Sequence, residues 1–118
     1  MAASHADGVY AARPSARFIM KHFFFKLIPP RPTFSQDMNE AEREVMRNHV
    51  AYWKSLTERG IALVFGPVAD PQGAWGMGIA EMPDESSARE LADNDPVTKS
   101  ALGFRFDVLL MPQIITRE

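Results

Sequence analysis

His49 is the residue of this 118-residue sequence whose type and position most directly suggest chemistry. It occupies an apolar helical stripe whose members recur at offsets of 0, 4, 7, 8 and 11 along the chain. The stripe consists of Val45, His49, Tyr52, Trp53 and Leu56. Histidine exchanges a proton near neutral pH, and a buried imidazole without a hydrogen bond costs about 1–3 kcal/mol. We therefore expect His49 to have a partner elsewhere in the fold.

The composition limits the classes of protein that are compatible with this chain. A length of 118 residues, with 46% hydrophobic and 24% charged residues, indicates one soluble globular domain. Thirteen basic and fifteen acidic residues give a net charge of −2 without a basic stripe, which argues against nucleic-acid binding. No apolar run approaches the roughly 20 residues that span a bilayer. The absence of cysteine excludes thiol chemistry and disulfides and agrees with a cytoplasmic location.

The order of predicted elements defines the expected fold class. Alternation of apolar residues and turn signals predicts strands at residues 17–28, 61–65, 74–82 and 103–111. A long helix lies between the first two strands and a shorter one between the last two, while residues 33–38 are expected to form a loop. The order β-α-β-β-α-β predicts a ferredoxin-like α+β fold, with an antiparallel four-stranded sheet and both helices on one face.

Capping residues mark where the helices begin. Asn39 is the expected N-cap of the first helix, and Glu42 completes a capping box three residues later. The first helix is expected to continue to about residue 59. Asp84 caps the second helix, and the Asp95–Pro96 pair predicts a further short helical turn.

The first strand is apolar on both of its faces, which has a consequence for assembly. One face carries Phe23, Phe25 and Leu27, and the other carries His22, Phe24 and Ile28. Two helices cover only one face of the sheet, so the other face would be a large exposed apolar patch. We expect a second copy to cover it in a homodimer. The alternative is a monomer whose open face is in water.

The two ends of the chain are expected to lie outside the folded domain. Residues 1–17 have no helical or strand periodicity and are predicted to form a mobile N-terminal tail. The domain is expected to span residues 18–112, followed by a short C-terminal tail at residues 113–118.

Four segments of the chain resemble the YCII-related (YciI-like) family. They lie at residues 21–23, 49–56, 65–68 and 92–96. In order along the chain they supply a helix with H-x-x-Y/W-x-x-x-L, a G-P before the hairpin and a D-x-D-P after the second helix. Each motif is short, but their order on this secondary structure makes the resemblance substantial over residues 18–112.

The resemblance implies a dimeric α+β barrel and a site. A His–Asp pair in the cleft of each monomer is proposed as catalytic in this family, and by position it would be His49 and Asp95. One branch of the family is associated with dehydrochlorination of chlorinated hydroxyquinones, and the wider superfamily includes muconolactone isomerases. Read without the resemblance, His49 is a satisfied core histidine and Asp95 a helix cap.

Other candidate residues are less specific. Tyr52 lies one turn from His49 and could contact a substrate or simply fill the core; Gly66 and Pro67 could shape a pocket or bend the strand. His22 is expected to be structural. No metal-binding spacing of histidines and no phosphate-binding glycine loop occurs, so we expect neither a metal nor another cofactor.

Two functions remain open from the sequence. The first is an acid–base enzyme of lyase or isomerase type that acts on a small cyclic or aromatic compound through His49 and Asp95. The second is a non-catalytic module that binds a small ligand in the same cleft. The apolar residues of the cleft suit both.

Overall fold

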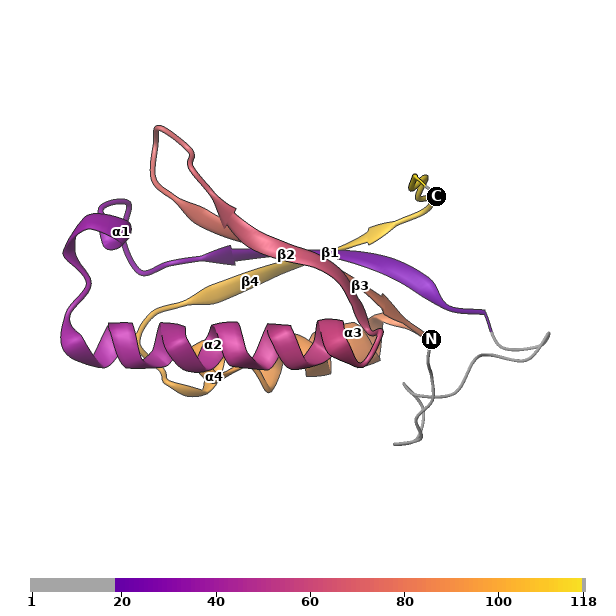
Figure 1. Cartoon of the computed structure of the whole chain (residues 1–118), viewed down its shortest axis with the longest axis horizontal. Helices are drawn as coiled ribbons and strands as arrows, with labels where there is room; N and C mark the ends of the chain where they lie inside the picture. Colours follow the sequence, from indigo (N-terminus) through magenta and orange to yellow (C-terminus); the bar gives the residue numbers. More distant parts are fainter. Residues whose placement is uncertain (1–18, 118) are drawn as a thin grey trace.

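Four strands and four helices follow one another in the computed structural model, which describes residues 19–117. They are β1 (Lys21–Ile28), α1 (Phe34–Asp37), α2 (Glu40–Glu58), β2 (Ala62–Val68), β3 (Trp75–Met82), α3 (Glu85–Asp93), α4 (Pro96–Lys99) and β4 (Arg105–Met111). The strands form one sheet in the order β2-β3-β1-β4, and every neighbouring pair is antiparallel. Figure 1 shows α2, α3 and α4 on one side of this sheet. The predicted ferredoxin-like α+β fold is therefore confirmed, while the predicted tail at residues 1–17 lies outside the described residues.

The long helix α2 begins at the cap that the sequence predicts. The Asn39 side chain accepts a hydrogen bond from the backbone N–H of Glu42, and the Glu42 carboxylate accepts one from the N–H of Asn39. This capping box satisfies two backbone donors that the first turn of a helix leaves without partners. The apolar stripe of α2 then buries His49, Trp53 and Leu56 against the sheet. The cap and the stripe together set the position of His49 under the sheet.

The connection between α3 and α4 also follows the predicted capping residues. Asp84 accepts a hydrogen bond from the N–H of Ser87 and caps α3. Asp95 accepts one from the N–H of Val97, and Pro96 occupies the first turn of α4, where its missing N–H is not needed. The chain turns between the two helices, and α4 packs against α2. This turn brings Asp95 to the middle of α2.

The prediction of a loop at residues 33–38 was wrong. A short helix, α1, forms there at Phe34–Asp37. Its turn is held by a hydrogen bond from the Thr33 hydroxyl to Asp37 and by a side chain, Phe34, that is buried to 5% exposure. Four helical residues are too few to show a 3.6-residue period. The burial of Phe34 comes from tertiary packing against Phe104, with ring centroids 5.2 Å apart.

The two faces of the sheet differ in how deeply their side chains are buried, and β1 shows this by alternating along its length. Phe23, Phe25 and Leu27 are buried beneath the helices, whereas the alternate residues of β1 are only partly buried. On the helix side of β3, Gly78 leaves room for the Trp53 ring, since a Cβ there would lie 2.6 Å from that ring. β2 tolerates Pro67 because it is an edge strand, where a missing N–H breaks no ladder on its outer side.

Candidate active site

His49 and Asp95 meet beneath the sheet, although 46 residues separate them in the sequence. Nδ1 of His49 lies 2.8 Å from Oδ2 and 3.1 Å from Oδ1 of Asp95. Asp95 is fully buried, and His49 is 9% exposed. α2 supplies the histidine, and the turn between α3 and α4 supplies the aspartate. The pair that the family resemblance implies is thus within hydrogen-bonding distance in this fold.

The hydrogen bonds around Asp95 determine which nitrogen of His49 carries the proton. Oδ2 accepts a hydrogen bond of 2.8 Å from Nε1 of Trp53, and Oδ1 accepts one of 3.0 Å from the N–H of Val97. Indole and backbone N–H groups can only donate, so both oxygens of Asp95 act as acceptors here. Nδ1 of His49 must therefore be the donor of the third contact. In the neutral ring Nε2 is then an unprotonated acceptor.

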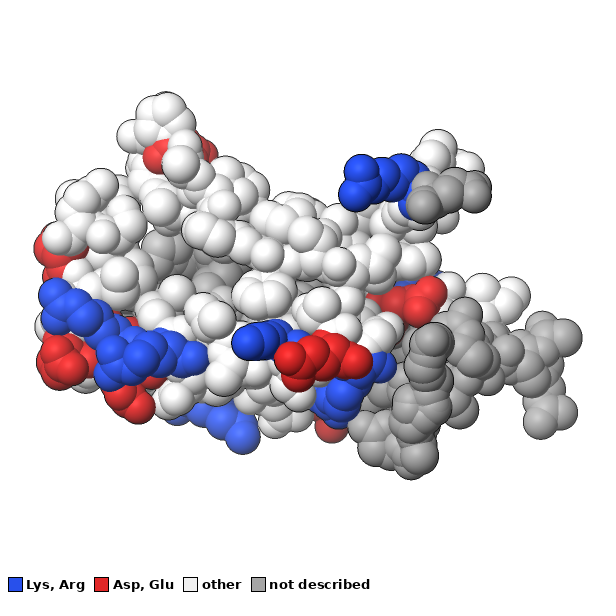
Figure 2. All heavy atoms as spheres, in the orientation of Figure 1, with Lys and Arg blue, Asp and Glu red and all other residues white. Residues whose placement is uncertain are grey.

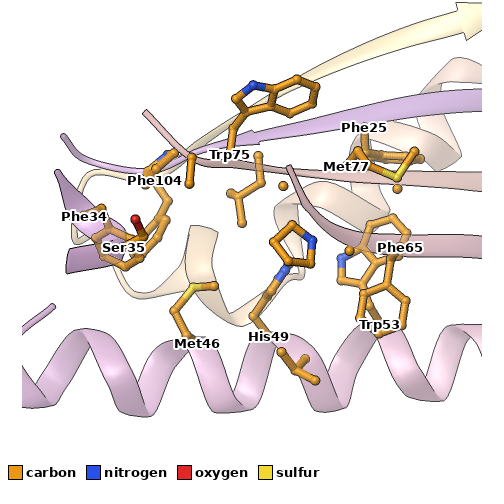
Figure 3. Close-up of a pocket in the computed structure, with 18 of the residues that line it drawn as sticks. Phe25, Phe34, Ser35, Met46, His49, Trp53, Phe65, Trp75, Met77 and Phe104 are labelled. Atoms are coloured by element: carbon orange, nitrogen blue, oxygen red, sulfur yellow. The ribbon is translucent and has the colours of Figure 1, made fainter. Parts of the chain in front are cut away.

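A cavity of about 250 Å³ lies next to the histidine. Figure 3 shows the ring of His49 pointing from α2 into this cavity, between Met46 and Trp53. Among the described residues, the hydrogen bonds to His49 involve Nδ1 alone. Because Nδ1 is turned to Asp95, Nε2 is the nitrogen that a bound molecule can reach. Asp95 lies behind the histidine and does not line the cavity.

The cavity walls are apolar and come from every layer of the fold. Phe25, Leu27 and Gly76 form part of the sheet side, and Met46, Val50 and Trp53 come from α2. Figure 3 shows Phe34, Ser35 and Phe104 together at one end of the cavity, and Met38 and Phe106 are among the other residues that line it. Engineered apolar cavities of about 150 Å³ admit benzene. The space therefore suits one ring with a few substituents.

An ion-pair cluster holds α1 over this end of the cavity, and we call it the Arg31 clamp. Two guanidinium nitrogens of Arg31 donate to the two carboxylate oxygens of Glu42, at 2.8 and 2.9 Å. Nε of Arg31 donates to Asp37 at the end of α1, at 2.8 Å. The paired guanidinium, followed by the N–H of Asn39, lowers the pKa of Glu42 from 4.5 to about 2. The clamp thus ties the start of α2 to the segment that covers the cavity.

The structure also locates the other residues that the sequence singled out. Gly66 and Pro67 line the cavity at its β2 edge. Tyr52 lies outside the lining, and its hydroxyl donates to the carbonyl of Leu91 at 2.7 Å, which joins α2 to α3. His22 lies on the sheet face away from the helices, with Nε2 3.5 Å from a carboxylate oxygen of Glu81.

Sequence reasoning missed the role of Trp53, which it assigned only to the core stripe. Trp53 follows His49 by one helical turn, a spacing that places both side chains on one side of α2. Both donate to the same carboxylate. An indole N–H one turn after a candidate histidine was therefore the available signal that the two share an acceptor.

Residues 19–117 contain neither a metal-binding cluster nor a membrane-spanning helix. No group of three or more histidine, aspartate or glutamate side chains lies in an arrangement that could hold a metal ion. None of the helices there is both long and apolar enough to span a membrane.

The four-stranded sheet and its helices place this protein in the ferredoxin-like α+β class, with a His–Asp pair beside an apolar cavity. Comparison with known protein families then identifies its family. The YCII-related domain matches residues 23–112, so the chain belongs to the YCII-related family. No curated protein matches it.

Two solved structures are similar in fold. An uncharacterized protein from Thermotoga maritima has 9% sequence identity and a TM-score of 0.48, over 79% of this chain and 99% of its own. A protein of unknown function from Nitrosomonas europaea has 7% identity and a TM-score of 0.46, over 86% of this chain and 98% of its own.

Proposed function

We propose that this protein is a cofactor-free acid–base enzyme of lyase or isomerase type that acts on a small cyclic or aromatic compound. The observation that supports this most is the orientation of His49, whose Nδ1 bonds to buried Asp95 while its ring enters the cavity. His49 is the catalytic residue in this proposal, and Asp95 is its positioning residue. Gly66 and Pro67 contact the substrate from the β2 edge.

The proposed chemistry needs one proton-transfer group. Nε2 of His49 removes a proton from a C–H or O–H of the bound ring, and Asp95 stabilises the imidazolium that forms. In an isomerisation, the same proton returns to another atom of the substrate, as in muconolactone isomerases. In an elimination, the electrons of the broken C–H bond form a double bond as the leaving group departs from the adjacent carbon, as in dehydrochlorination. Either reaction is balanced without an oxidant or reductant.

The test is turnover of quinone and lactone substrates by the wild type and by His49→Gln. We expect turnover by the wild type and its loss in the variant, while circular dichroism and thermal unfolding show that the variant is still folded. Turnover that survives His49→Gln would refute the assignment of His49.

One observation favours a second candidate, a non-catalytic binding module. Apart from His49, the lining residues between positions 19 and 117 include no titratable side chain, so a second acid or electrostatic stabiliser would have to come from elsewhere. A binding module would show saturable binding without turnover and would tolerate His49→Asn. The same substrate panel, read by both binding and turnover, separates the two candidates.

We also propose that the protein is a homodimer through the open face of the sheet. Strand register aligns Val64, Ile79, Phe24 and Leu109 in one apolar row across all four strands. Val64 is 46% exposed and Leu109 is 58% exposed in the single chain. Covering this row with a second copy would remove it from water and complete a dimeric α+β barrel. Analytical ultracentrifugation of wild type and Leu109→Lys tests this, with a dimer expected for the first and a monomer for the second.

A further inference from the structure

The cavity lining, within the part of the chain that the structure describes, includes no aspartate, glutamate, lysine or arginine. Among these described lining residues, His49 is the single titratable one, and Ser35 on α1 carries the only hydroxyl. The indole N–H of Trp53 already donates to Asp95, and the Trp75 ring packs with Phe24 and Lys26 on the opposite face of the sheet. The hollow beside α2 is bordered by uncharged side chains, while the charged residues of α2 lie on its outer surface (Figure 2).

The nearest charged groups are not available to a ligand. The guanidinium group of Arg31 donates hydrogen bonds to the carboxylates of Glu42 and Asp37. Asp95 is fully buried behind His49 and accepts from Trp53 and Val97 as well. While His49 is neutral, an ion that entered the cavity would lose its hydration without finding a charged side chain among the described lining residues.

The position of the proton on His49 adds a requirement on the group that a ligand presents to the ring. With the proton on Nδ1, the neutral ring presents the lone pair of Nε2 to the cavity. A carboxylate would place its own lone pairs against this nitrogen. A hydroxyl or an acidic C–H would instead bring a proton to it.

We propose that the cavity selects uncharged single-ring compounds that direct an O–H or an acidic C–H to Nε2 of His49, and that it rejects carboxylates and ammonium ions of the same size. This inference rests on the proposed function of the site and narrows it. Substrates of hydroxylated-ring type fit the cavity, and ring compounds that carry a carboxylate do not.

The first experiment compares three probes of similar size: phenol, benzoate and benzylammonium. Binding is followed by protein NMR, with the indole signal of Trp53 reporting on the cavity. We expect phenol to shift this signal and to bind at least about tenfold more tightly than either ion, a factor that corresponds to about 1.4 kcal/mol. Equal binding of benzoate, or no binding of phenol, would overturn the proposal.

A matched pair of variants then tests whether the uncharged wall is the cause. Val50 lines the cavity and is 46% exposed, so a lysine there can keep its ammonium near the mouth. Ala51 is its neighbour on α2, is exposed and lies outside the cavity. Val50→Lys should shift the preference from phenol toward benzoate, and Ala51→Lys should leave it unchanged. An equal response in both variants would show that net charge of the protein, not the wall, governs selection.

His49→Gln separates this inference from the proposed function. The variant lacks the proposed proton-transfer group but keeps the uncharged walls, so it should lose turnover and still reject benzoate and benzylammonium. Loss of the charge preference in His49→Gln would overturn selection by the walls. Persistence of turnover in that variant would count only against the catalytic assignment.

Discussion

Helix α2 contributes one residue to each of two acid–base pairs, which differ in how completely their hydrogen bonds are satisfied. At its start, both oxygens of Glu42 accept from Arg31, and one also accepts from the N–H of Asn39. In its middle, the oxygens of Asp95 accept from Trp53, Val97 and His49. Each carboxylate also caps a helix, Glu42 through its capping box and Asp95 as the N-cap of α4.

The difference between the pairs lies in the basic partner. The guanidinium of Arg31 directs its donors at Glu42 and Asp37, and as a permanently charged group it exchanges no proton near neutral pH. The imidazole of His49 uses one nitrogen for Asp95 and brings the other to a cavity. A hydrogen-bonded acid–base pair is therefore suited to chemistry only when one partner keeps a titratable atom facing a space that a ligand can enter.

The largest expected contrast is in turnover. On a substrate found in the screen, His49→Gln should lower kcat by roughly 100- to 10,000-fold, which is the usual contribution of general acid–base catalysis. Glu42→Gln should act on stability instead and cause a much smaller loss of kcat. Similar losses of kcat in the two variants would remove the distinction between the pairs.

The next contrast is in the free energy of unfolding. Asp95→Ala leaves buried donors on His49, Trp53 and the backbone without an acceptor, and we expect a loss of about 3–5 kcal/mol. Asp84 is also an aspartate N-cap, but it is exposed. Asp84→Ala should cost only about 0.5–2 kcal/mol. Chemical denaturation measures both, and equal losses would mean that Asp95 acts only as a cap.

The two tryptophans provide a finer comparison, since each donates to an aspartate. Trp53→Phe removes a buried hydrogen bond to the Asp95 carboxylate, and losing a bond to a charged group costs about 1.5–3 kcal/mol. Trp75→Phe removes a partly buried bond to Asp70, and water can replace it. We expect the first substitution to be the more destabilising in urea unfolding. The reverse order would contradict the central place of Trp53 in the site.

The smallest expected effect is the pH dependence of the Arg31 clamp. The pKa of Glu42 in the folded protein is lowered to about 2, chiefly by Arg31, from its usual 4.5. A lowered folded-state pKa stabilises the protein above the unfolded value, so this contribution should disappear as pH falls from 4.5 toward 2. Urea midpoints of wild type and Glu42→Gln should therefore converge over this range. A constant difference would show that Glu42 stabilises the fold without its charge.

Much of the fold was predictable because its signals are local. The Asn39–Glu42 capping box and the apolar stripe of α2 are read from residues three and four apart. The Asp95–Pro96 start of α4 is similarly local. The short helix α1 was not predictable from local sequence. Its stability depends on the packing of Phe34 against Phe104, which lies just before β4 and far away in the sequence.

The site was only partly predictable for the same reason. His49 was identified as an ionisable residue in an apolar stripe, and family resemblance pointed to Asp95. Their contact depends on the turn between α3 and α4, which sequence periodicity does not specify. The cavity depends on how α1, α2 and the strands pack, and its walls include Met46 and Val50, which have no distinctive pattern.

The tautomer of His49 is the most direct test of the central claim, and ¹⁵N NMR of the imidazole measures it. In the neutral form of the ring, we expect the wild type to carry its proton on Nδ1 and to have an unprotonated Nε2. Asp95→Asn should weaken this preference, because its amide can also donate. A wild-type ring that is protonated on Nε2 instead would contradict the proposed base, since no lone pair would then face the cavity.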